Sequence, residues 1–215
     1  MDFQAKLERI KQRVEGNLPP AYLKVMHEAT AALERSGISA RVLKAGQTAP
    51  SFELSDYKGN LISSQDLLKS GPLVVTFYRG VWCPYCNADL AELNHHLPEI
   101  EKRGASLIAI SPDLPKFLSK VVLMQNLDFN ILFDEQNKLA AQFGVKWTYS
   151  EDLKELYRDK LQINLEFNQG NPDWSVPLPS RFIIDQKGVI RYAESKVDYR
   201  ERPNPDHMLA ALKAL

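Results

Sequence analysis

An alternation of strand-like and helix-like segments between residues 72 and 143 constrains the fold of this chain most strongly. Runs rich in branched and aromatic residues predict three buried strands, at residues 72–78, 105–110 and 130–133. Segments with apolar residues at helical spacing follow these runs, at residues 83–103, 116–125 and 137–143. Strands that alternate with helices favour parallel pairing through crossover connections. We therefore expect an α/β protein whose helices cover both faces of a central sheet.

The C-terminal part of the chain predicts an addition to this sheet. Residues 150–180 interrupt the alternation with a charged helical piece and a loop, and we interpret them as an insertion. Residues 181–185 and 189–192 then predict two strands joined by a tight turn at Gly188. The sheet should thus gain an antiparallel pair and become mixed, and a helix from His207 to the C-terminus should follow.

The first forty residues predict two helices. Phe3, Leu7, Ile10 and Val14 fall at spacings of three and four and form one apolar stripe. A second helix is expected at residues 21–35. We expect a helical extension over residues 1–40 and a main domain over residues 41–215. The sequence leaves open whether the stripes pack on their own domain or form a contact in a homodimer.

Charge and apolar content limit the partners and the compartment. Lys and Arg together number 27 and Asp and Glu number 27, so no net field favours nucleic acid or anionic lipid. The chain has no run of about 18 apolar residues that would span a membrane. Its first residues also lack the apolar stretch of a signal peptide. The sequence therefore predicts a cytoplasmic protein with no nucleic-acid or membrane partner.

The only two cysteines, Cys83 and Cys86, fall where a predicted strand passes into a predicted helix. The helix dipole and the free N–H groups of a first turn stabilise a thiolate, which is the nucleophilic form of cysteine. Cys86 follows one turn later, within reach for a disulfide with Cys83. This spacing indicates a redox-active dithiol.

The two cysteines allow two other interpretations. In the first, both are inert residues of the core, since free cysteine is often buried. They would alternatively bind zinc, but zinc needs about four ligands, and the adjacent His95 and His96 would point in different directions from a helix. We expect these histidines to lie on a solvated face and the protein to need no metal and no cofactor.

Several motifs in residues 45–192 resemble one known family. They are Ala49-Pro50 before the central strand, Trp82-Cys83-Pro84 after it, Ser111-Pro112-Asp113 and Phe182-Ile183-Ile184-Asp185. In this order they resemble the alkyl hydroperoxide reductase and thiol-specific antioxidant family, a peroxiredoxin-like branch of the thioredoxin fold. The resemblance implies a thioredoxin-like mixed sheet. It also implies that Cys83 attacks a peroxide and becomes a sulfenic acid, that Cys86 captures it as a disulfide, and that a dithiol such as thioredoxin reduces the pair.

The chain departs from the family pattern at two places. Typical peroxiredoxins carry Pro-x-x-x-Thr/Ser-x-x-Cys, but Gly80 lies three positions before Cys83 and Thr76 seven before it. Pro179 replaces the arginine that the family places before its Phe-Ile-Ile-Asp strand. Arg79 is a candidate substitute, a cation that lowers the pKa of Cys83 and binds the peroxide oxygen. The alternative for Arg79 is a solvated charge at the end of a strand.

Pro179 has a further interpretation. Thioredoxin-like proteins place a cis-proline just before this strand, opposite the cysteines, where the backbone pairs with a thiol substrate. A cis bond at Pro179 would favour disulfide exchange over peroxide chemistry. Otherwise Pro179 is a loop residue.

Other candidates flank the thiols. We expect Trp82 and Tyr85, with Asn87, to shape substrate access, although packing explains them equally well. Trp147 and Trp174 either line the pocket or, as we favour, pack in the core or on the surface. Asp198 and Arg200 form either an ion pair near the site or an exposed turn, and we favour the turn.

Three functions follow from these observations. The first is an antioxidant peroxidase that reduces hydroperoxides through the Cys83–Cys86 dithiol, regenerated by a thioredoxin-type protein or glutathione. The second is a thiol–disulfide oxidoreductase that acts on disulfide substrates through the same residues. The third is a redox-sensing binding module whose disulfide alters a surface made by the N-terminal helices. The first is the function that we favour, and the other two are alternatives.

Overall fold

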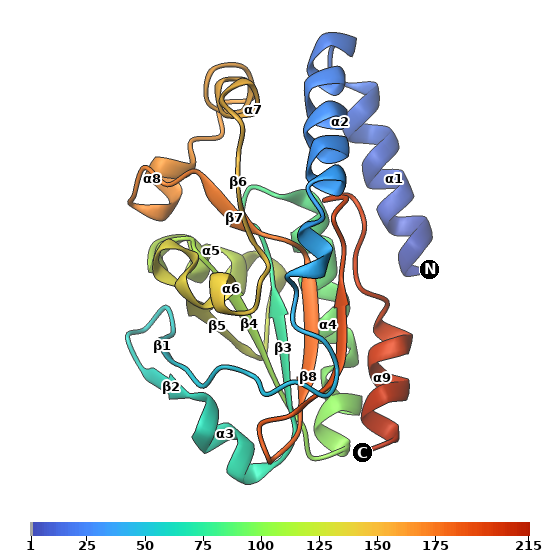
Figure 1. The fold of residues 1–215 in the computed structure, drawn as a ribbon, viewed down its shortest axis with the longest axis vertical. Helices are drawn as coiled ribbons and strands as arrows, with labels where there is room; N and C mark the ends of the chain where they lie inside the picture. Colours follow the sequence, from blue (N-terminus) through green and yellow to red (C-terminus); the bar gives the residue numbers. More distant parts are fainter. Residues whose placement is uncertain (1) are drawn as a thin grey trace.

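A five-stranded mixed sheet forms the centre of the protein (Figure 1). The computed structural model describes residues 2–215, so Met1, the first residue of the expected extension, lies outside the described residues. The sheet order is β5-β4-β3-β8-β9. Its strands are β3 (Leu73–Phe77), β4 (Ser106–Ser111), β5 (Asn130–Phe133), β8 (Ser180–Ile184) and β9 (Ile190–Ser195). Strands β3, β4 and β5 pair in parallel, whereas β8 and β9 add antiparallel pairs. The predicted mixed sheet is confirmed.

Each face of the sheet carries its own apolar cluster, because side chains alternate along a strand. The helices that cover them are α3 (Ser64–Ser70), α4 (Pro84–Lys102), α5 (Pro115–Gln125), α6 (Lys138–Gln142) and α9 (Pro205–Lys213). Val74 and Ile183 belong to the cluster under α4, α5 and α9. Val75 and Phe182 belong to the opposite cluster, under α3 and α6. Helices thus cover both faces, as the alternation predicts.

Shorter elements complete the main part of the chain. They are the antiparallel pair β1 (Glu53–Ser55) and β2 (Leu61–Ser63), the antiparallel pair β6 (Lys146–Thr148) and β7 (Ser175–Pro177), and the helices α7 (Glu151–Glu155) and α8 (Leu165–Gln169). A π-helical turn, Leu156–Lys160, continues α7. The sequence did not predict α3, α8 or the β6–β7 pair. The pairing of β6 with β7 joins the two ends of the segment between residues 150 and 180 to the rest of the domain.

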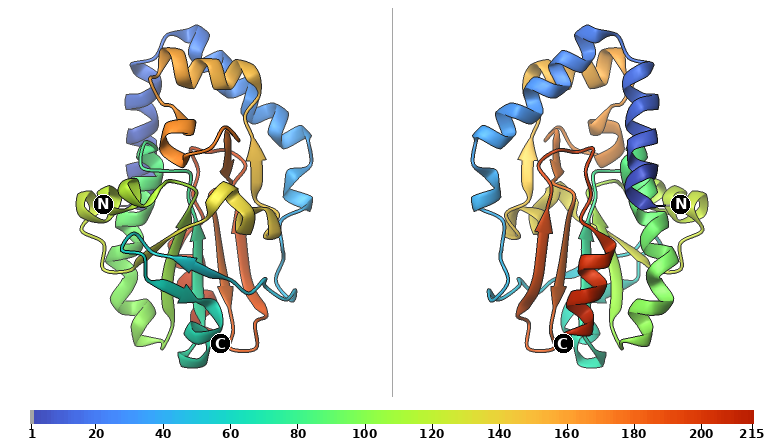
Figure 2. Two further views of the ribbon diagram at one scale, coloured as in Figure 1. Left: turned by 90° about the vertical axis from the view of Figure 1, so that its left-hand side faces the viewer. Right: turned by 90° about the vertical axis from the view of Figure 1, so that its right-hand side faces the viewer.

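The N-terminal helices lie across the end of the molecule where β3 ends and α4 begins (Figures 1 and 2). They are α1 (Phe3–Gly16) and α2 (Pro20–Arg35). Phe3, Leu7 and Met26 are buried in the same cluster as the inner face of α4. The apolar stripes therefore pack on their own chain, the first of the two alternatives. The division into an extension over residues 1–40 and a domain over residues 41–215 stays a prediction.

No helix among the described residues combines the length and the apolar character needed to pass through a lipid bilayer.

Candidate active site

The two cysteines lie at the junction of β3 and α4. Cys83 is the residue before the first helical residue of α4, with φ −91° and ψ 109°, and Pro84 occupies the first helical position. Pro84 needs no N–H partner there, because the first turn of a helix leaves its donors free. The loop before it requires a glycine, since a Cβ on Gly80 would lie 2.5 Å from Trp82 Nε1 and 2.7 Å from Asp113 Oδ2. The predicted strand–helix junction is confirmed.

Both cysteines are unbonded to each other and almost completely buried, with exposed fractions of 1% for Cys83 and 0% for Cys86. Two arginines face their sulfurs. Arg202 Nη2 lies 2.9 Å from Cys86 Sγ and 3.6 Å from Cys83 Sγ. Arg79 Nη1 lies 3.9 Å from Cys83 Sγ, and the backbone N–H of Arg79 donates to Cys86 Sγ at 3.4 Å. The dithiol thus sits in a closed site with two guanidinium groups.

The arginines and the pairing of the thiols move the two pKa values in opposite directions. Burial alone raises the pKa of Cys83, but the hydrogen bond from Cys86 and the charges of Arg79 and Arg202 bring that pKa well below its usual value. Burial, together with the hydrogen bond to Cys83 and its charge, holds the pKa of Cys86 well above its usual value. Within the pair, Cys83 is therefore the more acidic thiol.

Arg79 is a buried residue of this site, with only 2% of its surface exposed. Its Nη2 donates to the hydroxyl oxygens of Tyr149, at 2.5 Å, and Tyr157, at 3.0 Å. Its guanidinium carbon lies 4.6 Å from the ring centre of Trp82 and 4.7 Å from that of Tyr199, within the range of cation–π contacts. The interpretation of Arg79 as a solvated charge is therefore wrong. No carboxylate is among these partners, which leaves the charge of Arg79 to act on the thiolate.

The cis-proline prediction is wrong, since the described residues contain no cis peptide bond. Pro179 lies buried between β7 and β8. Its carbonyl oxygen accepts a hydrogen bond from the N–H of Lys196 at 2.9 Å, and the N–H of the preceding Leu178 donates to Val145 at 2.8 Å. These bonds hold the backbone on both sides of the Leu178–Pro179 bond to neighbouring segments, so it is not free to pair with a substrate. A role of Pro179 in binding stays a prediction without this support.

The residues that flank the thiols occupy different positions. Trp82 is partly buried and packs edge-on against Tyr157, with ring centres 5.6 Å apart. Tyr85 is buried against Tyr199, at 5.9 Å. The side-chain amide of Asn87 donates to the carbonyl of Val81 at 2.9 Å and so fixes the loop. Packing explains all three residues, and substrate binding by Trp82 and Tyr85 stays a prediction.

Trp147 and Trp174, which are distant from the cysteines in sequence, both pack near Tyr149. Trp147 packs on Tyr149 with ring centres 4.9 Å apart, and Trp174 lies 6.3 Å from the same ring. Trp174 is buried, and its indole N–H donates to Glu166 at 2.6 Å. Both tryptophans therefore pack against other side chains, the alternative that the sequence favoured. These rings position the tyrosine that binds Arg79.

The Asp198–Arg200 turn is a partly buried ion-pair cluster, so its interpretation as an exposed turn is wrong. Arg200 donates to Asp198 at 2.7 Å and to Glu15 of α1 at 2.7 Å. Its Nη1 also lies 2.8 Å from the ring nitrogen of His27 in α2. The cluster joins the N-terminal helices to the turn whose neighbours Tyr199 and Arg202 cover the dithiol.

Several residues of the site were not predicted as such. They are Asp113, Tyr149, Tyr157, Tyr199 and Arg202. Asp113 had a sequence signal, because it follows the end of a predicted strand next to the cysteine loop. The tyrosines and Arg202 come from segments 63 or more residues beyond Cys86 in sequence, and no spacing connects them to the cysteines.

His95 and His96 lie in α4, where His95 is exposed and His96 is partly buried. His96 pairs with Glu92 across one helical turn, with 3.5 Å between Nε2 and Oε1. Within residues 2–215, no three His, Cys, Asp or Glu side chains are grouped so that they would hold a metal ion.

The fold and site define a class of protein: a thioredoxin-like domain with a buried dithiol between the central strand and its helix. Comparison with known proteins gives the family. Residues 45–193 match the family model described as AhpC/TSA family, and the chain belongs to that family. The predicted resemblance is thereby confirmed.

Individual relatives agree with this assignment. The chain is similar to Peroxiredoxin Bcp of Escherichia coli K12, with 34% identity over 103 residues, 48% of this chain and 65% of that protein. It is similar to the chloroplastic Peroxiredoxin Q of Populus jackii, with 32% identity over 200 residues, 90% of this chain and 81% of that protein. Among solved structures, the peroxidoxin BcpB from Mycobacterium tuberculosis matches with a TM-score of 0.63 and 26% identity, covering 80% of this chain and 98% of that chain.

Proposed function

We propose that this protein is a thiol peroxidase that reduces hydroperoxides. The observation that carries the proposal is the Cys83 sulfur, held as a thiolate beside the guanidinium groups of Arg79 and Arg202. The thiolate is the form of cysteine that attacks peroxides. The same guanidinium groups would stabilise the negative charge that develops on the departing oxygen.

Reduction of a peroxide by the Cys83–Cys86 dithiol takes two steps. The Cys83 sulfur attacks one peroxide oxygen, an S–O bond forms and the O–O bond breaks. The leaving oxygen takes a proton from solvent and departs as an alcohol, or as water from hydrogen peroxide, while Cys83 keeps the proton of the attacked oxygen and becomes a sulfenic acid. Cys86 then attacks the oxidised sulfur, water leaves and a disulfide forms. Two electrons have passed from the dithiol to the peroxide.

A reductant must return the disulfide to the dithiol, and we propose a thiol, either of a thioredoxin-type protein or of glutathione. We propose a cytoplasmic location, where thiol systems would keep the dithiol reduced. The second candidate, a thiol–disulfide oxidoreductase, rested in part on a cis-proline that the backbone lacks. The Cys83–Cys86 spacing alone still supports it.

Another distribution of roles between the cysteines is open to test. Arg202 and the backbone N–H of Arg79 both lie closest to Cys86. Counted from Cys86, the family pattern also places Cys83 at its Thr/Ser position and Arg79 at its Pro position. We assign the attack to Cys83, because it directly precedes the first turn of α4 and the charges of Arg79 and Arg202 lower its pKa.

Rapid mixing of reduced protein with hydrogen peroxide tests the proposal. The wild type should lose one thiol much faster than free cysteine does, and Cys83→Ser should lose this fast phase. Cys86→Ser should keep the first step and accumulate a sulfenic acid on Cys83, detected by dimedone labelling and mass spectrometry. A wild-type rate equal to that of free cysteine would overturn the proposal. Labelling at Cys86 in Cys83→Ser would exchange the two roles.

A further inference from the structure

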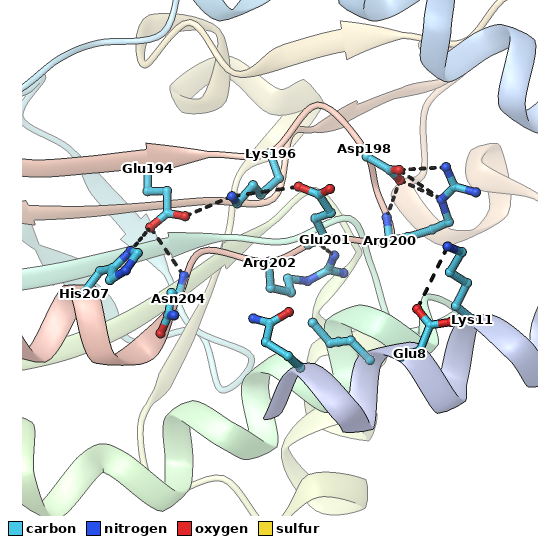
Figure 3. A pocket seen from close by; sticks show the side chains of 12 residues that line it. Glu8, Lys11, Glu194, Lys196, Asp198, Arg200, Glu201, Arg202, Asn204 and His207 are labelled. Atoms are coloured by element: carbon cyan, nitrogen blue, oxygen red, sulfur yellow. Dashed lines mark hydrogen bonds and ion pairs between the residues drawn. The ribbon is translucent and has the colours of Figure 1, made fainter. Parts of the chain in front are cut away.

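A cavity of about 420 Å³ lies between α1 and the segment that joins β9 to α9 (Figure 3). This volume is in the range of sites for small molecules, about 300–1,000 Å³. Arg202 lines the cavity and also contacts both sulfurs, so a single side chain links the cavity to the dithiol. The cavity therefore lies next to the reacting groups.

The cavity presents charges of both signs. Cations and anions alternate around it, as Figure 3 shows: Lys11, Lys196, Arg200 and Arg202, with Glu8, Glu194, Asp198 and Glu201. Several are only loosely paired. Lys11 is 3.9 Å from Glu8, and Glu201 is 3.8 Å from Lys196 with 61% of its side chain exposed. A ligand with both a carboxylate and an ammonium group would find a partner for each, whereas a ligand of one sign would meet repulsion.

The burial of the sulfurs favours a small reductant over a protein. In the dithiol form the exposed fractions are 1% for Cys83 and 0% for Cys86, so the catalytic sulfur of another protein would reach them only after the covering turn had opened. Tyr199 and Arg202 cover the site, and their turn is fastened to α1 by the Arg200–Glu15 pair. A small thiol in the cavity would already lie beside Arg202, the side chain that contacts both sulfurs.

From these observations we propose that the cavity binds a low-molecular-weight zwitterionic thiol of the glutathione type, which reduces the Cys83–Cys86 disulfide. The proposal rests on the proposed function, because that reaction forms the disulfide. The thiolate of the bound molecule attacks one protein sulfur, which breaks the disulfide and forms a mixed disulfide. A second thiol molecule attacks the sulfur of the first, and the reduced protein and the small-molecule disulfide leave. Two thiols supply the two electrons and two protons that the dithiol takes up.

The reductive half-reaction tests the cavity without any peroxide. The wild-type disulfide is formed with diamide, and its reduction is followed by tryptophan fluorescence as the thiol concentration rises. Reduction by glutathione should saturate, and reduction by uncharged 2-mercaptoethanol should rise linearly. A linear dependence for glutathione overturns the cavity proposal alone. A protein that reacts slowly with peroxide but shows saturable reduction overturns the proposed function alone.

Charge reversal on α1 gives a matched pair of variants. Lys11→Glu should lower the efficiency of glutathione and of 3-mercaptopropionate about fivefold and raise that of cysteamine, because the cavity then attracts an amine. Arg13→Glu changes charge equally on the same helix, outside the cavity lining, and should change each rate by less than about twofold. Equal effects of the two variants, or of Lys11→Glu on all three thiols, would show that the cavity does not bind the reductant.

Discussion

Two buried arginines near the dithiol are neutralised in different ways. Arg181 in β8 donates to the Asp89 carboxylate at 2.8 Å and to the carbonyl of Pro203 at 3.0 Å. Arg79 has tyrosine hydroxyls, aromatic rings and a thiol as partners instead. Arg181 is thus paired with a carboxylate inside the core. Arg79 instead meets an opposite charge when the Cys83 thiol is ionised.

A buried carboxyl group also lies at the cysteine loop. Asp113 is fully buried, and one of its oxygens accepts a hydrogen bond from the N–H of Val81 at 2.7 Å. Burial raises the pKa of Asp113 to about 7, an effect that the bond from Val81 only partly offsets. Asp113 is not among the groups that contact Arg79. We therefore expect the paired Arg181 to stabilise the fold and Arg79 to adjust the chemistry of sulfur.

Breaking the buried Arg181–Asp89 ion pair should lower the stability of the protein more than any other change considered below. Arg181→Met leaves Asp89 buried with Arg202 3.8 Å away, and should lower the free energy of unfolding by about 3 kcal/mol. Urea unfolding followed by fluorescence measures this loss. The double variant Arg181→Met/Asp89→Leu removes both charges and should recover most of the stability. A double variant as unstable as the single one would mean that lost packing, not the lone carboxylate, is responsible.

The pH dependence of stability should reveal the unpaired carboxyl. In the folded state the pKa of Asp113 is about 7, against 3.8 for an ordinary aspartate. Between these values the folded state binds more protons, so this group's stabilising contribution is complete below pH 3.8 and is lost as the pH rises through 7.

Asp113→Asn isolates this contribution from the other carboxyl groups, many of which act in the opposite direction. The free energy of unfolding of the variant relative to wild type should increase between pH 4.5 and pH 8, because only the wild type must ionise a buried acid. A difference that stays constant over this range would show that Asp113 is already ionised in the folded protein.

Removing the unpaired arginine should change reactivity more than stability. Arg79→Met takes away a cation that lowers the pKa of Cys83, and nearby opposite charges shift a pKa by about 1–3 units. Thiolate absorbance measured against pH should show this rise, and the peroxide rate at neutral pH should fall by about tenfold or more. Its loss of stability should be smaller than that of Arg181→Met. An unchanged thiolate titration would assign the effect to Arg202 alone.

The sequence predicted those features that depend on local pattern. Branched runs and helical spacing predicted the strands of the main sheet and α4, because each forms from neighbours in the chain. The position of Cys83 before Pro84 predicted the strand–helix junction in the same way. Short elements such as β7 were missed, because three residues that include Pro177 carry no period and form a strand only by pairing with β6.

The surroundings of the sulfurs depend on long-range packing, which local pattern does not encode. Arg202 follows Cys86 by 116 residues, and only the path of the chain after β9 brings its guanidinium to the thiols. The cis-proline was predicted from a place in a family pattern, while the backbone there is fixed by hydrogen bonds to Val145 and to Lys196, the residue after β9. The Asp198–Arg200 turn was expected to be exposed because its partners on α1 and α2 lie more than 170 residues away in sequence.

The smallest expected effect concerns a third kind of charge pair, which is partly exposed. Glu15→Gln weakens the bond from α1 to Arg200, and since such pairs contribute about 1 kcal/mol or less, the free energy of unfolding should change little. The turn that bears Tyr199 and Arg202 would nevertheless open more often, so iodoacetamide should alkylate Cys83 faster. Glu28→Gln removes an exposed pair with Lys24 within α2 and should leave alkylation unchanged. Equal alkylation rates in both variants would show that the turn is held by the packing of Tyr199 against Tyr85 rather than by its ion pair.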